Sequence, residues 1–262
     1  MVLTSKKVLT AKNFISKSSS VVANDTVENA QRYAASGFEN TYFLGYRELP
    51  LFLEKYSLGR RAVDYGCGTG RSTRFLQSNG FQVIGVDISK KMLQQAMRLD
   101  STAHYLHIKN TQIPVFNSSC DLVLSSFVLF TVPTKELLFS IFKEAYRCLR
   151  NGGVFIIVTG SEELYSHEWL SYETNYPQNV NLKSGDPAKI KLRDLGIEFT
   201  NYYWGGADYD ELIRSTGFKI LEKHFPYGKL HEGREWISEM KHAPYVIYIL
   251  QKDNFPHDSS DL

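Results

Sequence analysis

Apolar residues between positions 61 and 160 follow two alternating patterns. Short, nearly continuous apolar runs predict strands at 62–65, 81–87, 103–108 and 154–159, and another that opens the run 121–130. Apolar residues at helical spacing predict the helices between them, at 69–78, 89–99 and 134–149. Strands that are apolar throughout and alternate with helices indicate a parallel sheet covered on both faces.

The pattern changes on both sides of this segment. Before it we expect a short helix at 28–36 and an amphipathic helix at 45–57, which tolerates Pro50 only near its first turn. Residues 161–187 are polar, aromatic and irregular, and two runs at 189–193 and 197–204 flank a turn, which predicts a hairpin. A helix at 207–215 and strands at 218–225 and 245–252 follow.

These patterns divide the chain into five parts with no clear linker between them. We expect an N-terminal arm or lid at 1–44, a core at 45–160 and an inserted cap with the hairpin at 161–204. A C-terminal helix with strands that complete the sheet follows at 205–252, and a tail at 253–262. Residues 1–24 carry lysines but no acidic side chain, and a mobile arm is a better interpretation than a targeting peptide, which would be rich in arginine.

The segment VDYGCGTG (63–70) is the clearest candidate for binding chemistry. Its glycines let the backbone turn without a Cβ clash and let a ligand approach bare amides. The spacing is G-x-G-x-G, and Arg71 stands where the dinucleotide fingerprint needs its third glycine. Asp87 ends the next predicted strand, where a carboxylate accepts hydrogen bonds from both hydroxyls of a ribose. A nucleotide-like cofactor other than NAD is therefore indicated.

Charge and cysteine usage exclude several classes of protein. The 30 basic and 28 acidic residues nearly cancel, so binding to nucleic acid is disfavoured. Three cysteines, Cys67, Cys120 and Cys148, form neither a disulfide framework nor a zinc-binding spacing, which favours a cytoplasmic protein without a metal. No apolar run reaches membrane-spanning length.

Together the motifs resemble the class I S-adenosylmethionine-dependent methyltransferases, in particular the small-molecule type similar to those of quinone biosynthesis. The resemblance rests on VDYGCGTG, GVDISKKML (85–93), IPVFNSSCDLVLSS (113–126), LRNGGVFIIV (149–158) and the final YVIYILQK (245–252). It implies an α/β, Rossmann-like doubly wound sheet of about seven strands, mostly parallel with an antiparallel last strand. An N-terminal helical arm and an inserted cap hairpin would be added to that sheet.

The resemblance also implies roles for the matching positions in binding S-adenosylmethionine. Asp64 and the amides of the glycine loop should hold the methionine half, Asp87 the ribose, and Ser125 should face the sulfonium end. Lys109 stands where the family often has an aspartate near adenine, so Asn110 or Thr111 is the alternative contact there. The expected cofactor-binding residues are Asp64, Gly66, Cys67, Gly68, Asp87, Ile88, Met92, Asn110, Thr111 and Ser125. Met92 and Cys67 have plainer interpretations, as a core residue and as a small residue in a tight turn.

The acceptor should lie under the arm and the cap, where aromatic residues are frequent. Expected wall residues are Tyr33, Tyr42, Phe130, Tyr172, Tyr202, Tyr203 and Trp204, although half or more of such a set would only pack the cap. His167 is the one weak candidate for a catalytic base. We expect in-line transfer of a methyl group to an O, N or C nucleophile of a small molecule, by a monomer or homodimer. The alternatives are a protein or RNA methyltransferase, or a cofactor-binding module without catalysis.

Overall fold

The computed structural model describes residues 25–253, so the expectations for residues 1–24 and for most of the tail lie outside the described part. A seven-stranded sheet forms the centre of the fold, in the order β3-β2-β1-β4-β5-β10-β9. Its strands are β1 (Arg61–Tyr65), β2 (Gln82–Asp87), β3 (His104–His107), β4 (Cys120–Ser126), β5 (Leu149–Gly160), β9 (Phe218–His224) and β10 (Tyr245–Lys252). Strands β1 to β5 pair in parallel, and β10 runs antiparallel to both neighbours, β5 and β9. The predicted fold class is confirmed.

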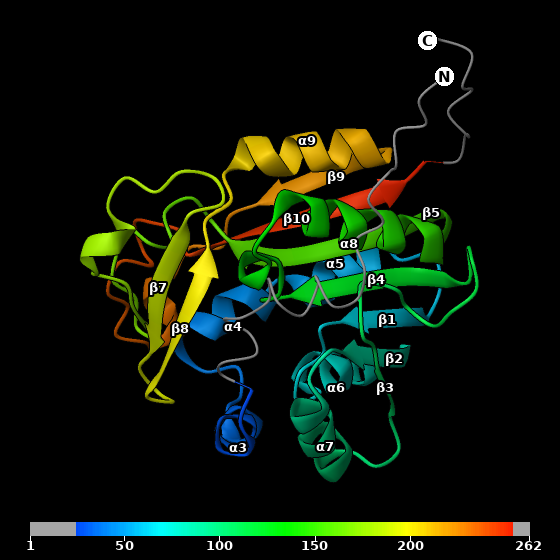
Figure 1. The fold of residues 1–262 in the computed structure, drawn as a ribbon, viewed down its shortest axis with the longest axis horizontal. Coiled ribbons are helices and arrows are strands. Elements are labelled where there is room, and N and C mark those ends of the chain that lie inside the picture. The colour runs from blue at the N-terminus through cyan, green and yellow to red at the C-terminus, as the bar shows by residue number, and fades with distance from the viewer. Residues whose placement is uncertain (1–24, 254–262) are drawn as a thin grey trace, which may run out of the picture.

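Helices cover both faces of this sheet (Figure 1). They are α3 (Val27–Ala35), α4 (Asn40–Tyr46), α5 (Leu49–Tyr56), α6 (Arg71–Ser78), α7 (Lys90–Leu99), α8 (Lys135–Cys148) and α9 (Gly206–Thr216). Helices α4, α5 and α6 pack on one face, and α8 and α9 on the other. Ser89 caps α7 as predicted, because its hydroxyl accepts a hydrogen bond from the Met92 N–H at 3.1 Å.

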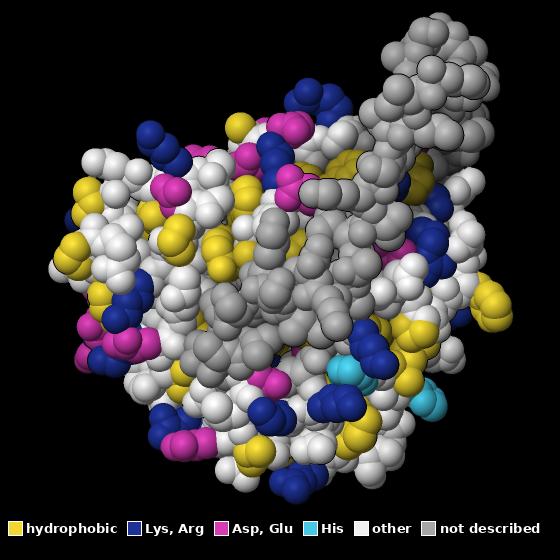
Figure 2. Space-filling model, in the orientation of Figure 1, with side chains coloured by type: hydrophobic (Ala, Val, Ile, Leu, Met, Phe, Trp, Pro, Cys, Tyr) yellow, Lys and Arg dark blue, Asp and Glu magenta, His cyan; other side chains and the backbone are white. Residues whose placement is uncertain are grey.

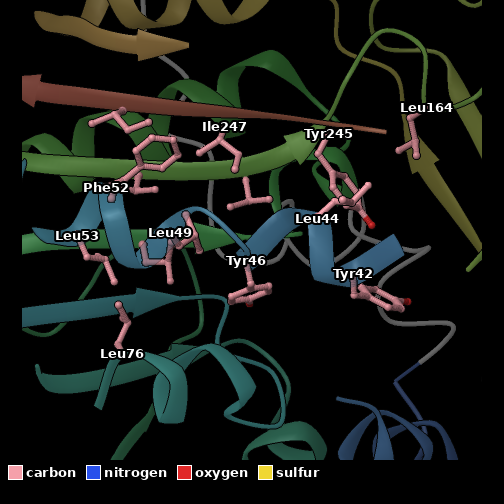
Figure 3. Packing of buried hydrophobic residues seen from close by; sticks show 14 of the residues in the cluster. Tyr42, Leu44, Tyr46, Leu49, Phe52, Leu53, Leu76, Leu164, Tyr245 and Ile247 are labelled. Carbon is pink, nitrogen blue, oxygen red and sulfur yellow. The ribbon is translucent and has the colours of Figure 1, made fainter. Parts of the chain in front are cut away.

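The central strands are apolar throughout because alternate side chains enter two different cores. Leu122 and Leu124 of β4 pack with α5 and α6, whereas Val123 between them packs with α8. On the first face, Leu49 and Leu53 of α5 lie above Leu76 of α6 (Figure 3). Both faces are therefore excluded from water, which is the condition that the apolar runs predicted.

Two elements differ from the pattern-based expectation. The segment expected as one helix at 45–57 is α5 alone, with Pro50 in its first turn, and a separate helix α4 precedes it. Helix α4 crosses the expected boundary between residues 44 and 45, and five of its seven residues are buried. Strand β5 begins at Leu149 and runs through the glycines that were expected to form a turn, with a bulge where it pairs with β4.

The insert after β5 folds into a second, antiparallel sheet of three strands. It contains β6 (Tyr172–Glu173), β7 (Pro187–Leu192) and β8 (Ile197–Tyr202), in the order β6-β7-β8. Strands β7 and β8 form the predicted hairpin, and β6 was not predicted. In Figure 1 they stand beside the end of the main sheet towards which β1 and β4 point.

A buried carboxylate ties the insert to helix α4. Glu239, which is fully buried, accepts hydrogen bonds from the Thr41 hydroxyl at 2.7 Å and from the Leu170 N–H at 2.7 Å. Thr41 and Ser171 also exchange two hydrogen bonds, of 3.1 and 2.9 Å. These bonds satisfy the buried carboxyl group and tie α4 to the insert.

Candidate functional site

A cavity of about 300 Å³ opens at the carboxyl ends of β1 and β4. The strand order reverses between these two strands, and ligands of open α/β sheets bind at such a switch point. Its lining includes residues of helices α3 and α4, of the glycine loop with the end of β2, of the loop after β4, and of strands β7 and β8 of the insert. The arm, core and cap expected from the sequence thus meet around one space.

The glycine loop has a backbone that only glycine adopts without strain. Gly66 and Gly68 have φ angles of +75° and +53°. A Cβ on Gly66 would lie 2.4 Å from the Val128 side chain, so packing excludes one there. A Cβ on Gly68 would meet no atom within 4 Å, which leaves open space above the loop on the cavity side.

The amides of this loop form hydrogen bonds within the protein, and their expected role in holding a ligand stays a prediction. The N–H groups of Gly66 and Cys67 both donate to the Val86 carbonyl, at 2.8 and 3.0 Å. The Gly68 N–H donates to a carboxylate oxygen of Asp87 at 2.8 Å. In this structure the loop therefore offers a ligand its shape and open space rather than these three donors.

Asp87 lies at the end of β2 and lines the cavity as predicted. One of its carboxylate oxygens accepts from Gly68 and the other from the Ser89 N–H at 2.7 Å. Burial raises the pKa of Asp87 above its usual value, and the two N–H groups oppose that change because they stabilise the charged form. The carboxylate is thereby held in one orientation beside the glycine loop.

Asp64 lies beneath the loop and is not part of the described cavity lining, and its expected contact with the methionine half stays a prediction. Its side chain is fully buried, and one oxygen accepts from the hydroxyls of Ser72 and Thr73 at 2.7 and 2.6 Å. The other oxygen has no hydrogen-bond partner among the described residues. Burial raises the pKa of this carboxyl to about 6.

The residues expected near adenine divide into two groups. Ile88 and Met92 line the cavity, together with Ile108, which was not predicted. Asn110 and Thr111 do not line it, and the Asn110 side chain instead accepts the Gln112 N–H at 2.9 Å within its own loop. A short polar side chain after a strand stabilises local turns in this way, and the sequence does not distinguish that role from ligand binding.

At the end of β4 the cavity is lined by Ser126 and Phe127 rather than by the expected Ser125. Ser125 is fully buried, and its hydroxyl has no hydrogen-bond partner among the described residues. The Ser126 hydroxyl is 2.7 Å from that of Tyr46. Phe127 has a φ of +60°, which is strained for an aromatic residue and turns the chain away from the sheet at the cavity wall.

Four of the predicted aromatic wall residues line the cavity: Tyr33, Tyr42, Phe130 and Tyr172. Tyr42 meets Tyr172 edge to face, with ring centroids 5.3 Å apart, and Tyr172 shares a short hydrogen bond with Tyr245. Burial raises the pKa of Tyr42 to about 12 and those of Tyr172 and Tyr245 well above their usual value. These phenols keep their protons at neutral pH, and one of the Tyr172 and Tyr245 hydroxyls donates its proton to the other.

Three other aromatic predictions are wrong about location. Tyr202, Tyr203 and Trp204 are absent from the described lining of the cavity, which Phe199, Thr200 and Asn201 of β8 form instead. Trp204 is buried with α9 and donates its indole N–H to the Val132 carbonyl at 3.0 Å. Tyr203 and Trp204 follow the end of β8 at Tyr202, where the chain leaves the strand towards α9.

His167, the expected weak candidate for a base, lies outside the described lining of the cavity. Its ring stacks on that of His242, with centroids 3.6 Å apart, and His242 is 2.7 Å from Glu163. Burial and then the neighbouring His242 lower the pKa of His167. The ligand atoms of these three half-buried residues lie within 4.8 Å of one another, an arrangement able to hold a metal ion.

Sequence reasoning missed Arg71, Tyr46 and Tyr245 as residues of the cavity. Arg71 was noted only because it occupies the position of a glycine. Tyr42 and Tyr46 are four residues apart and project from the same side of α4 (Figure 3). Recognising α4 as a helix would have placed Tyr46 beside Tyr42.

Comparison with known proteins agrees with this geometry. A family model described as a methyltransferase domain matches residues 63–157. An uncharacterized methyltransferase of Synechocystis sp. is 33% identical over 186 residues, which cover 70% of this chain and 78% of the relative. A malonyl-[acyl-carrier protein] O-methyltransferase of Enterobacter lignolyticus is 35% identical over 99 residues, and the chain spans 38% of that relative's length.

The fold is also that of a solved protein. The structure of an S-adenosylmethionine-dependent methyltransferase, described as putative, from Listeria monocytogenes superposes with a TM-score of 0.61 at 19% identity. The match covers 80% of this chain and 97% of that one. The motifs, the cavity at the switch point and these relatives agree with one another. The chain belongs to the family of S-adenosylmethionine-dependent methyltransferases.

Proposed function

We propose that the protein transfers the methyl group of S-adenosylmethionine to a small-molecule acceptor in the cavity between the sheet and the insert. The observation that carries this proposal is the continuity of the cavity. The same cavity is lined by Asp87 and the glycine loop and by the phenols of α4 and the insert. The cofactor and the acceptor would therefore share one space, as transfer between them requires.

The residues present fit the cofactor. The open space over Gly68 admits a ligand against bare backbone, and Asp87 is oriented to accept from ribose hydroxyls. Ile88, Met92 and Ile108 provide an apolar surface for adenine. Asp64 lies outside the described lining with one unpartnered oxygen, so its contact with the methionine half stays a prediction.

When bound, S-adenosylmethionine supplies a methyl group on a positively charged sulfur, which an in-line nucleophile displaces. The protein's part is orientation and exclusion of water, which alone can contribute on the order of 7–11 kcal/mol. Aromatic faces of Tyr42, Phe127 and Phe130 tolerate the neighbouring positive charge. The described lining contains no histidine, and its carboxylates are those of Asp25 and Asp87; an acceptor that is nucleophilic without losing a proton would need neither.

The surface supports a small-molecule acceptor over RNA. On the face seen in Figure 2, basic and acidic side chains are interspersed and form no field of one sign. Among residues 25–253, no helix is both long and apolar enough to cross a membrane. The malonyl-[acyl-carrier protein] relative is by name an O-methyltransferase, which makes oxygen the first atom to test. A cytoplasmic location, the lack of a metal and a monomeric or homodimeric state remain predictions.

Two measurements on the purified full-length protein test the proposal. Isothermal titration with S-adenosylhomocysteine should show binding, and its absence would refute the proposal outright. Cofactor carrying a radioactive methyl group is then incubated with a cell extract, with and without the protein, and small molecules are separated from protein and RNA. Protein-dependent label in the small-molecule fraction supports the proposal, whereas label in protein or RNA would establish the alternative class of acceptor. Binding without any transfer would indicate a cofactor-binding module.

A further inference from the structure

Arg71, the first residue of α6, carries a half-buried positive charge inside the cavity. One terminal nitrogen of its guanidinium donates to the Gly37 carbonyl at 2.6 Å and to the Ser36 hydroxyl at 3.3 Å. Among residues 25–253, no carboxylate forms an ion pair with it. Of the residues outside this range, 1–24 contain no Asp or Glu, and 254–262 contain Asp258 and Asp261.

Aromatic rings surround this guanidinium in place of acids. Its central carbon lies 4.9 Å from the ring centre of Tyr42, 5.5 Å from that of Phe38, and 5.9 Å from those of Tyr46 and Phe127. Such contacts stabilise a cation partly but supply no hydrogen-bond acceptor in the ring plane, and the acceptors of Gly37 and Ser36 engage only one of its two terminal nitrogens. The buried Tyr42 hydroxyl also lacks a well-formed hydrogen bond, although that of Tyr172 is close to it.

A guanidinium in this setting calls for an anion. A buried charge is costly unless it is paired, and the proposed cofactor brings a second positive charge, on sulfur, into the same cavity. Arginine presents parallel N–H groups that match the two oxygens of a carboxylate, and the Tyr42 hydroxyl adds a third donor. A phosphate, with nearly two negative charges, would leave one of them uncompensated by this single arginine.

We propose that Arg71, together with the Tyr42 hydroxyl, is the carboxylate receptor of the cavity. This inference rests on the proposed function, because two ligands of that reaction can bring a carboxylate. One is the methionine end of the cofactor, and the other is an acceptor that is itself a carboxylic acid. Both would place the same chemistry, one delocalised negative charge, against the same fork of donors.

The test compares wild-type protein with Arg71→Gln and Arg71→Lys. Arg60→Gln is the matched control, because Arg60 also stacks on an aromatic ring, that of Phe81 at 5.0 Å, but lies outside the described cavity lining. Binding of S-adenosylhomocysteine and of its decarboxylated analogue is measured by isothermal titration. Benzoate and benzamide are then titrated into each protein saturated with S-adenosylhomocysteine. Circular dichroism and the melting temperature establish that each variant is folded.

Loss of a charge-assisted, two-pronged pair should weaken binding at least tenfold. If the cofactor supplies the carboxylate, Arg71→Gln should bind S-adenosylhomocysteine at least tenfold more weakly than the wild type does, and its affinity for the decarboxylated analogue should be unchanged. If the acceptor supplies it, Arg71→Gln loses affinity for benzoate and not for benzamide, while cofactor affinity is kept. Arg71→Lys, which keeps the charge but not the fork, should lie between the wild type and Arg71→Gln. Tyr42→Phe should weaken the same carboxylate probe by a smaller factor.

The inference is overturned if Arg71→Gln and Arg60→Gln bind every carboxylate probe as the wild type does, while wild-type protein binds S-adenosylhomocysteine. That result would leave the proposed function intact. Should Arg71→Gln not fold, Arg71→Lys decides by the same comparison. Failure of the wild type to bind S-adenosylhomocysteine would instead refute the proposed function, so the two failures are told apart.

Discussion

Replacing Asp87 with asparagine removes a charge from the predicted ribose site and changes almost nothing in size. In the structure the two carboxylate oxygens hold the Gly68 and Ser89 N–H groups at 2.8 and 2.7 Å. Asparagine keeps one acceptor and turns an NH2 group towards the other donor. A hydrogen bond to a charged group is worth about 1.5–3 kcal/mol, so cofactor affinity should fall about 10- to 150-fold.

The assay is isothermal titration with S-adenosylhomocysteine and with its 2′-deoxy analogue. In wild-type protein the deoxy analogue should bind more weakly, because it lacks a hydroxyl for Asp87. In Asp87→Asn the two ligands should differ little, because the partner of that hydroxyl has gone. Asp100→Asn is the control, since Asp100 also accepts a backbone N–H two residues on, at 2.9 Å, but lies outside the described cavity lining. Equal affinities of Asp87→Asn and wild type for the normal ligand would refute the placement of the ribose.

Three further predictions follow from the same structure. Gly68→Ala and Gly80→Ala should each cost about 1 kcal/mol of stability, because both residues have positive φ and open space at Cβ. Only Gly68→Ala should also weaken the binding of S-adenosylhomocysteine, as measured by isothermal titration. The raised pKa of buried Asp64, about 6 against a usual 3.8, means that the folded state holds its proton more tightly than the unfolded state does. The stability that this proton contributes is therefore present below about pH 4 and is lost as the pH rises to about 6. In urea unfolding, the free energy of unfolding of Asp64→Asn should rise relative to that of the wild type by up to about 3 kcal/mol over that range. Parallel pH profiles of the two proteins would contradict this. Burial raises the pKa of all three cysteine thiols. Native protein at pH 8 should therefore react slowly with a thiol reagent, and urea-unfolded protein should react rapidly. Rapid reaction of the native protein would contradict the buried placement of the cysteines.

The strands of the sheet could be predicted because their signal is local. Residues 245–252 are apolar because both faces of that strand are covered, and the observed strand has the predicted bounds. Helix α4 was missed because a glycine and three aromatic residues give it weak helix propensity, and its stability comes from burial and from the bonds around Glu239. Strand β6, of two residues, has no pattern that a sequence could show.

The residues of the candidate site likewise divide into those that the sequence could predict and those that it could not. Asp87 could be predicted because its role depends on its position at the end of a strand, next to a loop close in sequence. Trp204 and His167 could not be placed, because aromatic and polar residues in an insert face a cavity or a neighbour according to how the insert docks. Arg71 was visible as a residue but not as a charge that forms no ion pair within residues 25–253, since pairing depends on segments distant in the chain.

The amino-acid sequence by itself determined the alternation of strands and helices, the glycine loop with Asp87, and through them the family, because these features depend on periodicity and on neighbours a few residues away. Only the tertiary structure decided which side chains line the cavity. It turned the loop amides inward to Val86 and Asp87, and it placed Tyr42 and Arg71 against each other from separate helices. The physical reason is that burial, pairing and cavity shape are properties of contacts between distant segments, which no local pattern records.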